Sequence, residues 1–142
     1  MSEKEPAPAW HSPEFYHTAH AIGAPRVSFI QHQGKRILTV DFSHSDLDLV
    51  KATAAEYLHV LSAEPANSVL SLIEVEGIPF SPEALKIGAE LTDLGQPYSL
   101  RTAVSGVSGF RSFMLQTIIK TARQPVRLFH ERSEALDWLT GI

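Results

Sequence analysis

The sequence lacks cysteine altogether, which excludes disulfide bridges and thiolate metal sites. It also lacks an apolar run near the ~20 residues of a membrane-spanning helix, and its first residues lack the basic start and apolar stretch of a secretory signal. Basic residues are scarce, since 12 Lys and Arg accompany 16 Asp and Glu, and no basic stripe alternates with aromatic residues. We therefore expect a cytoplasmic protein that has no membrane span and does not bind nucleic acid.

What the chain does contain is ordinary for a globular protein: 142 residues, of which 44% are apolar and 20% are charged. That length is enough for one domain with a hydrophobic core. The charge is unevenly distributed, because residues 43–97 hold nine acids and two bases whereas residues 98–142 hold six bases and three acids. This distribution fits two solvated faces of opposite sign, or a basic rim that receives an anionic partner or ligand.

Strand and helix patterns alternate from Val27 to Leu139. The first two strands are joined around Gln33-Gly34-Lys35, a hairpin turn, and each later connection is a predicted helix. The order ββαβαβαβα therefore predicts a layered α/β domain over residues 26–142, with a mixed, mostly parallel sheet of four to five strands. The expected strands are Val27–Gln31, Arg36–Phe42, Ser68–Val75, Tyr98–Val104 and Val126–His130, and the expected helices are Asp46–Ala63, Pro82–Leu94, Ser108–Arg123 and Ser133–Leu139.

Serines precede three of these helices. Ser45, Ser81 and Ser108 are each expected to accept a free N–H group of the first helical turn. Pro82 follows Ser81 directly, which is typical of the first turn of a helix. Gly95 is expected to end the second helix.

Residues 1–25 are expected to form a tail, because prolines interrupt them and no apolar period continues through them. Trp10, Phe15 and Tyr16 argue against a plain linker. We expect this aromatic tail either to be mobile or to pack on the domain or on a second subunit.

Four residues of metal-ligating types recur in the tail at steps of three: His11, Glu14, His17 and His20. On an α-helix each step of three rotates the side chain by about 60°, so the first and last would point in opposite directions. They would not converge on one ion. We expect no metal site and no cofactor.

A glycine-rich loop, Ser105-Gly106-Val107-Ser108-Gly109, joins a predicted strand to a predicted helix. Free N–H groups at such a junction can bind an anion, and Arg111 could strengthen that binding. The alternative is that the glycines allow a tight turn and Ser108 is only a helix cap. The segment matches neither a dinucleotide fingerprint nor a phosphate-binding P-loop.

The helix that follows this loop carries two apolar stripes. One stripe is expected to face the sheet and consists of Phe110, Phe113, Met114, Thr117 and Ile118. The other, formed by Leu115, Ile119 and Ala122, lies roughly 100° around the helix. Either a neighbouring helix covers this second stripe, or the stripe is an interaction face for a partner or for a second copy.

Polar residues also gather after the second strand, at Asp41, His44, Asp46 and Asp48. The aspartates favour the start of the next helix through its dipole. Together with Ser105 or Ser108, His44 and Asp41 supply the residue types of a catalytic triad, but nothing in the spacing brings them together. We therefore expect that the protein is not an enzyme.

Several segments resemble SpoIIAA-like, STAS-related proteins, the bacterial fold class of sulfate-transporter and anti-sigma-factor-antagonist domains, which is related to the lipid-binding CRAL-TRIO group. The resemblance covers roughly residues 27–139, and the segments that carry it are G-K-R-I-L-T-V-D-F-S (34–43), N-S-V-L-S-L-I-E-V-E-G (67–77), A-V-S-G-V-S-G-F-R (103–111) and E-A-L-D-W-L (134–139). It implies a mixed sheet with helices on its faces.

The same resemblance implies a phosphorylation site. Anti-sigma antagonists are phosphorylated on a serine of a D-S-S-G segment, and here the equivalent segment is G-I-P-F-S-P-E-A-L (77–85), with Ser81 in that position. The aspartate and glycine of that segment are missing, and Pro82 follows directly. A phosphate on Ser81 would gain from the helix dipole; the alternative is that Ser81 is a plain helix cap.

The resemblance implies a non-enzymatic regulatory or protein-interaction domain that works with a protein partner or as a homodimer. The alternative, from the related lipid carriers, is a protein that binds a small apolar or anionic ligand. That alternative requires an apolar cleft beside the helix Ser108–Arg123, with Arg111 at its mouth.

Overall fold

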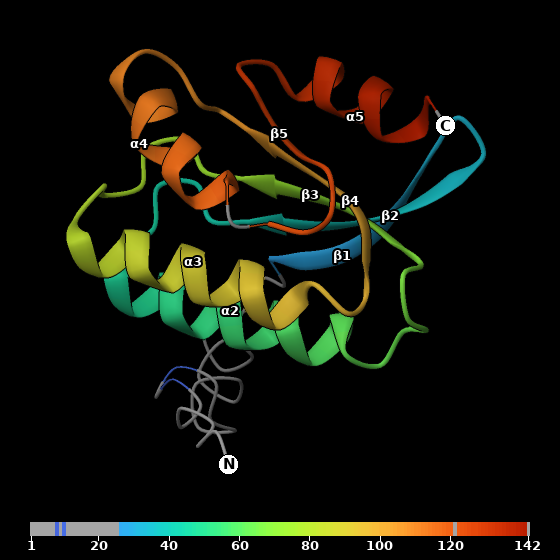
Figure 1. The fold of residues 1–142 in the computed structure, drawn as a ribbon, viewed down its shortest axis with the longest axis horizontal. Coiled ribbons are helices and arrows are strands. Elements are labelled where there is room, and N and C mark those ends of the chain that lie inside the picture. Colours follow the sequence, from blue (N-terminus) through green and yellow to red (C-terminus); the bar gives the residue numbers. More distant parts are fainter. Residues whose placement is uncertain (1–7, 9, 11–25, 121, 142) are drawn as a thin grey trace.

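The computed structural model describes residues 26–120 and 122–141, together with Pro8 and Trp10. Its elements follow the predicted order ββαβαβαβα (Figure 1). The strands are β1 (Val27–His32), β2 (Lys35–Asp41), β3 (Val69–Glu74), β4 (Ser99–Ser105) and β5 (Val126–Phe129), and the helices are α2 (Leu47–Leu61), α3 (Pro82–Gly95), α4 (Phe110–Ile119) and α5 (Arg132–Thr140).

The described strands form one five-stranded sheet in the order β1-β2-β3-β4-β5. β1 and β2 are antiparallel, and every other neighbouring pair is parallel. Gln33 and Gly34 join the first pair with φ values of 50° and 77°. Two successive positive φ values are typical of the two-residue hairpin turn that matches strand twist. The predicted mixed, mostly parallel sheet is therefore confirmed.

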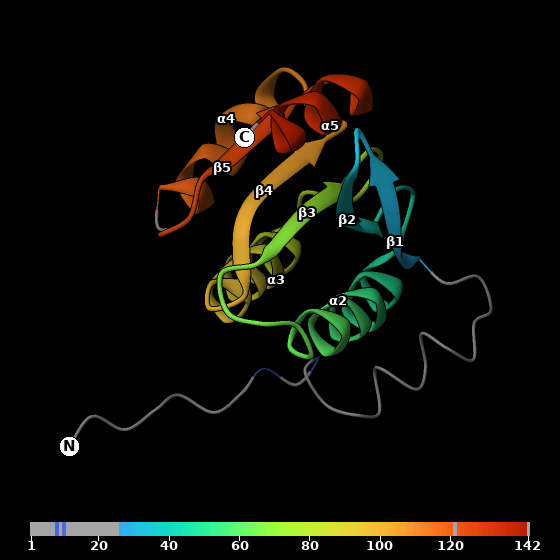
Figure 2. The same ribbon diagram turned by 90° about the vertical axis from the view of Figure 1, so that its right-hand side faces the viewer.

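Helices cover both faces of the sheet (Figure 2). α2 and α3 pack on one face, where aliphatic residues of α2 meet those of β2 in the larger hydrophobic core. α5 packs on the opposite face against β3, β4 and β5. Seven buried residues form the smaller core on that side: Ile37, Leu70, Leu72, Ala103, Ala135, Leu136 and Leu139. Strand side chains alternate between the two cores, as the pleat of a sheet requires.

Trp10 belongs to the larger core. Its ring is buried, and its Nε1 donates to Glu90 Oε1 of α3 at 3.2 Å. A buried indole needs such a partner for its N–H group. Trp10 thus packs on the domain, which is one of the alternatives considered for the tail. Phe15 and Tyr16 lie outside the described residues.

The first helix begins one residue later than predicted. The carboxylate of Asp46, not the hydroxyl of Ser45, accepts the N–H of Leu49 at 2.9 Å. Ser45 is buried, and its hydroxyl oxygen accepts a hydrogen bond from Arg26 at 3.0 Å. The same Arg26 nitrogen donates to the carbonyl oxygens of Asp41 and Ser43. A contact with a distant arginine thus occupies the serine that the local pattern selects as a cap.

Of the other helix ends, the start of α3 agrees with the prediction, and the end of α3 and both ends of α4 differ from it. Ser81 caps α3 as predicted, since its hydroxyl accepts the N–H of Ala84 at 3.1 Å. Gly95 is the last residue of α3, one position beyond the predicted end. Gly109, with a φ of 58°, replaces Ser108 as the N-cap of α4 and offers no side chain to the helix. α4 ends at Ile119 rather than at Arg123.

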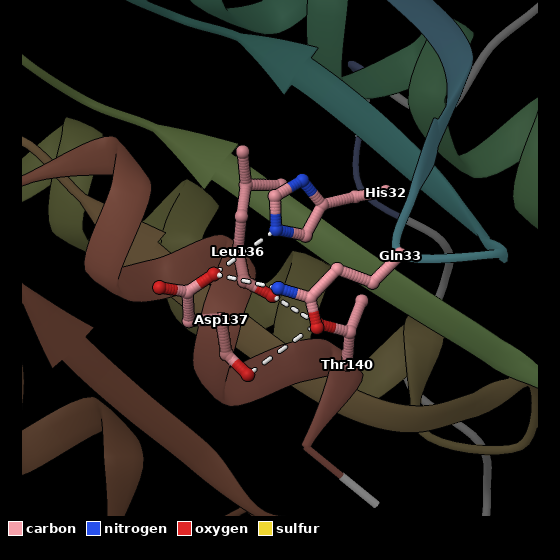
Figure 3. A network of polar contacts seen from close by, with 5 residues as sticks. All are labelled: His32, Gln33, Leu136, Asp137 and Thr140. Atoms are coloured by element: carbon pink, nitrogen blue, oxygen red, sulfur yellow. Dashed lines mark hydrogen bonds and ion pairs between the residues drawn. The ribbon is translucent and has the colours of Figure 1, made fainter.

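The β1–β2 hairpin is held against α5 by a network of polar contacts (Figure 3). His32 Nε2 lies 3.0 Å from Asp137 Oδ1, and the side-chain amide of Gln33 donates to the same oxygen at 3.4 Å. The Thr140 hydroxyl lies near the Gln33 carbonyl and donates to the backbone of Leu136 at 2.9 Å. These contacts lie near the surface, so they fix the position of the hairpin more than they add stability.

Tyr57 and Ser71 form a buried polar pair between α2 and β3. The Tyr57 hydroxyl donates to Ser71 Oγ at 2.8 Å, and both side chains are buried. Burial raises the pKa of Tyr57 from 10.0 to about 12, and the hydrogen bond with Ser71 opposes that rise. The neutral phenol is therefore the form that the fold prefers.

This preference predicts a loss of stability in alkali. The folded pKa lies above the unfolded one, so the contribution of Tyr57 is complete below pH 10 and is lost as the pH rises toward 12. We expect the free energy of unfolding to fall by about 2–3 kcal/mol over this range through Tyr57. Urea denaturation at several pH values measures it, with Tyr57→Phe as the control. Equal alkaline losses in the wild type and the variant would contradict the assignment.

Candidate functional site

A cavity of about 100 Å³ lies between α3, α4 and the sheet. Its floor is a row of three side chains that the strand register brings together, because Ile73 of β3 pairs with Val104 of β4, which in turn pairs with Leu128 of β5. Parallel strands place paired residues side by side on the same face. The remaining lining residues come from α2, α3, α4, β5 and the turns after β2 and β3: Phe42, Val50, Val75, Ile78, Pro79, Phe80, Ala84, Leu85, Ile87, Gly88, Leu91, Thr92, Leu115, Ile118, Ile119 and Val126.

The wall between the two helices depends on Gly88, in the middle of α3. A Cβ atom at this position would lie 3.5 Å from Cδ1 of Ile118 on α4. Any larger side chain would therefore extend into the space between the helices. Glycine in a helix interior costs about 1 kcal/mol relative to alanine. The chain carries this cost where the missing side chain keeps the cavity open.

The cavity offers apolar contact and no reactive group. None of its described lining residues is titratable, and only Thr92 among them has a polar side chain. The Thr92 hydroxyl donates to the carbonyl of Gly88 at 2.8 Å, so its proton is already engaged. An enclosed cavity lined by apolar side chains stays dry and can bind an apolar molecule. The lining residues that the structure describes include no acid, base or nucleophile.

Two residues of the predicted interaction face, Leu115 and Ile119, line this cavity together with Ile118. All three are half-buried. Residues spaced by three and four positions share one helix face, and this face turns toward α3 and the sheet rather than outward. The side chains of Phe110, Phe113, Met114 and Thr117, which form most of the other predicted stripe, lie outside the described part of the structure. Ala122 is half-buried beyond the end of α4, where its N–H donates to the carbonyl of Ile119.

The loop that was considered for anion binding is fixed between neighbouring strands. Ser105 is buried, and its carbonyl accepts the N–H of Val75, while the N–H of Val107 donates to Phe129. Gly106 has a φ of 84° and lies against the backbone of Glu76. This backbone angle and this close approach favour glycine, as the alternative of a tight turn rather than an anion-binding loop requires.

Described carboxylates lie near this loop, and one of them is paired with an arginine. Glu74, at the end of β3, pairs with Arg132 Nε at 3.0 Å. Burial raises the pKa of Glu74, Arg132 opposes this rise, and Asp41 adds to it. Arg132 is therefore already engaged by a carboxylate, and Asp41 adds negative charge at the same edge of the sheet. Ser108 and Gly109 are exposed, the side chain of Arg111 lies outside what the structure describes, and anion binding here stays a hypothesis.

The polar residues after β2 serve the local turn. Asp41 Oδ1 accepts the N–H of Ser43 at 2.8 Å, and Asp46 caps α2. His44, with a φ of 56°, lies where a Cβ atom on Gly77 would stand. Ser81 is half-buried with its hydroxyl engaged by the start of α3, and its phosphorylation stays a prediction.

Within the described ranges, no three His, Asp or Glu side chains are grouped closely enough to hold a metal ion. The four tail residues considered for metal binding, His11, Glu14, His17 and His20, lie outside these ranges. None of the helices described has both the length and the apolar composition needed to cross a membrane.

Comparison with known proteins identifies the fold. No family model matches the chain, and no curated protein sequence matches it either. Among solved structures, the chain is similar to an uncharacterised protein of the DUF3478 family with a SpoIIAA-like fold from Shewanella loihica PV-4. The two superpose with a TM-score of 0.62 at 15% sequence identity, over 80% of this chain and 91% of the other. The predicted SpoIIAA-like fold is therefore confirmed, and the resemblance at this identity concerns the fold alone.

Proposed function

We propose that this protein is a non-enzymatic binding protein whose α3–α4 cavity takes up a small apolar ligand. The observation that supports the proposal most strongly is the composition of the cavity, whose floor and walls are aliphatic or aromatic apart from Thr92. Gly88 adds to it, because a larger residue here would fill the space and stabilise the helix. Of the two functions considered from the sequence, ligand binding is the one that requires an apolar cleft beside this helix.

The size of the cavity limits the part of a ligand that it can enclose. An enclosed apolar cavity of roughly 150 Å³ binds benzene in another protein, and this one measures about 100 Å³. It therefore encloses at most one ring or a short alkyl chain. An aromatic ring buries about 150–250 Å², which is worth roughly 4–6 kcal/mol before the cost of association. We expect a Kd in the millimolar range for a probe such as toluene.

Placing a charge on the cavity wall should abolish this binding. Leu115→Asp introduces a carboxylate that must be desolvated when an apolar molecule enters. We expect it to weaken toluene binding more than tenfold, as measured by saturation-transfer NMR. Gln116→Asp is the matched control, because Gln116 is the exposed neighbour on the same helix. If the Leu115→Asp variant is folded by its NMR spectrum and binds toluene as tightly as the wild type, the proposed site is refuted.

A protein partner or a second copy of the chain is the second candidate occupant of this region. It is favoured by the half-buried state of Leu115 and Ile119, which leaves part of each side chain in contact with solvent. An apolar side chain from the partner would then enter the cavity. Light scattering after size exclusion distinguishes the two. A monomer that binds toluene supports the ligand, and a dimer that Leu115→Asp dissociates supports the partner.

A further inference from the structure

A second, smaller space, the inner space, adjoins the apolar cavity and has polar as well as aliphatic side chains in its lining. This inner space of about 40 Å³ shares five lining residues with the cavity: Ile73, Leu91, Thr92, Val104 and Val126. Shared walls on both α3 and the sheet make the two spaces neighbours. A volume of about 40 Å³ exceeds the roughly 10–15 Å³ that one water-sized group needs. A ligand in the cavity can therefore place one small polar group at its inner end.

Hydroxyl groups and an amide line part of this inner end, beside aliphatic side chains. Besides the shared residues and Gly95, the lining consists of Tyr57, Ser99, Thr102 and Gln124. None of the described lining residues carries a charge at neutral pH, and Tyr57, Ser99 and Thr102 are buried. An ionised ligand group would have to leave water without meeting an opposite charge, which is costly. The site therefore suits a neutral group.

The hydrogen bonds already made at this end decide which neutral group fits. The hydroxyl of Ser99 donates to the carbonyl of Gly95 at 2.9 Å, and that of Thr102 donates to Gln124 Oε1 at 3.1 Å. Thr92 and Tyr57 likewise donate to protein acceptors. A hydroxyl has one proton and two lone pairs. With their protons engaged, these oxygens can only accept from a ligand, while the amide nitrogen of Gln124 can donate.

We propose that the ligand is a neutral amphiphile with a short apolar tail and a terminal hydroxyl, whose tail fills the cavity and whose hydroxyl donates to the oxygens of the inner space. This inference rests on the proposed function, since it assumes that the cavity binds. A carboxylate, which only accepts hydrogen bonds, would face the lone pairs of these oxygens. A hydroxyl donates to one of them and accepts from the Gln124 amide.

Three probes of six carbon atoms each test the proposal on the full-length protein: 1-hexanol, its isomer 1-methoxypentane, and hexanoate. The alcohol and the ether contain the same atoms, and only the alcohol can donate a hydrogen bond. One neutral hydrogen bond corresponds to roughly a fivefold change in affinity. We expect 1-hexanol to bind about fivefold more tightly than the ether, and hexanoate at least tenfold more weakly than 1-hexanol. Isotope-labelled methyl spectra of the protein follow each titration.

Thr102→Val supplies an internal control, because it removes one acceptor and preserves the shape of the side chain. It should reduce the preference for 1-hexanol over the ether, because Ser99, Thr92 and Tyr57 remain as acceptors, and it should leave the affinity for the ether unchanged. Equal binding of alcohol and ether to the wild type, or tighter binding of hexanoate, would overturn the hydroxyl proposal while toluene binding keeps the cavity as the site. Failure of toluene and of all three probes to bind would overturn the proposed function itself.

Discussion

Replacing Gly106 with alanine is expected to lower the free energy of unfolding by about 3–4 kcal/mol. The φ of 84° at Gly106 lies in the left-handed region, where a side chain costs about 1–2 kcal/mol. The added Cβ would also lie 3.0 Å from the backbone nitrogen and Cβ of Glu76 and 3.2 Å from its Cα. Backbone atoms cannot move aside cheaply, which adds roughly 1–3 kcal/mol. The melting temperature should fall by roughly 10 °C.

Gly34→Ala is the matched control for this change. Gly34 also has a positive φ, of 77°, but no other atom lies within 4 Å of the position of its Cβ. Only the conformational cost applies there, so we expect about 1–2 kcal/mol. The difference between the two variants isolates the close approach of the loop to Glu76. Equal losses in the two variants would show that the loop does not depend on this contact.

Gly88→Leu is expected to raise stability and to abolish ligand binding together. Leucine is a strong helix former, so the change gains about 1 kcal/mol in the helix, and filling apolar space adds roughly another 1 kcal/mol. The Cβ contact with Ile118 at 3.5 Å is an ordinary van der Waals distance. The leucine would occupy space that the ligand needs, so we expect toluene affinity to fall more than tenfold.

Two further variants test whether the loss of toluene affinity in Gly88→Leu comes from filling the cavity rather than from adding a leucine to α3. Ala89→Leu places the same side chain on the exposed face of α3 and should change neither binding nor stability by much. Gly88→Ala should give most of the helix gain with a smaller loss of affinity. A gain in stability at the cost of function is expected where a residue is retained for binding. Undiminished toluene binding by Gly88→Leu would place the ligand elsewhere.

Most of the fold could be predicted from the sequence because local patterns agree with the final arrangement. β3 spans Val69–Glu74 within the predicted Ser68–Val75, since its aliphatic run is buried on both faces of the sheet. The start of α3 follows directly from Ser81 and Pro82. Each of these signals acts within a few residues along the chain, so no tertiary contact alters the outcome.

The predictions that differ from the structure involve contacts between distant residues or unusual backbone angles. Ser45 and Asp46 are both good caps, and Arg26 decides between them by binding the serine. At α4, the positive φ of Gly109 sets where the helix starts, and Ser108 remains outside it. A local sequence pattern shows neither that Arg26 contacts Ser45 nor that Gly109 has a positive φ.

The cavity could not be predicted as a volume, because it depends on how closely two helices approach the sheet. Its floor follows from the register of three strands, which aligns Ile73, Val104 and Leu128. One signal was present in the sequence: Gly88 interrupts an otherwise helix-forming segment. A glycine in such a position, far from either helix end, often has a packing or binding role.

The measurement that tests the central claim most directly is a map of methyl shifts in the labelled protein during a toluene titration. Binding in the cavity predicts saturable shifts for Ile73, Val104 and Leu128, with Leu115 and Ile119 moving in parallel. The methyl signals of Leu72 and Leu139, in the core beneath α5, should not shift. Shifts that spread equally over both cores, or that never saturate, would contradict a specific site between α3 and α4.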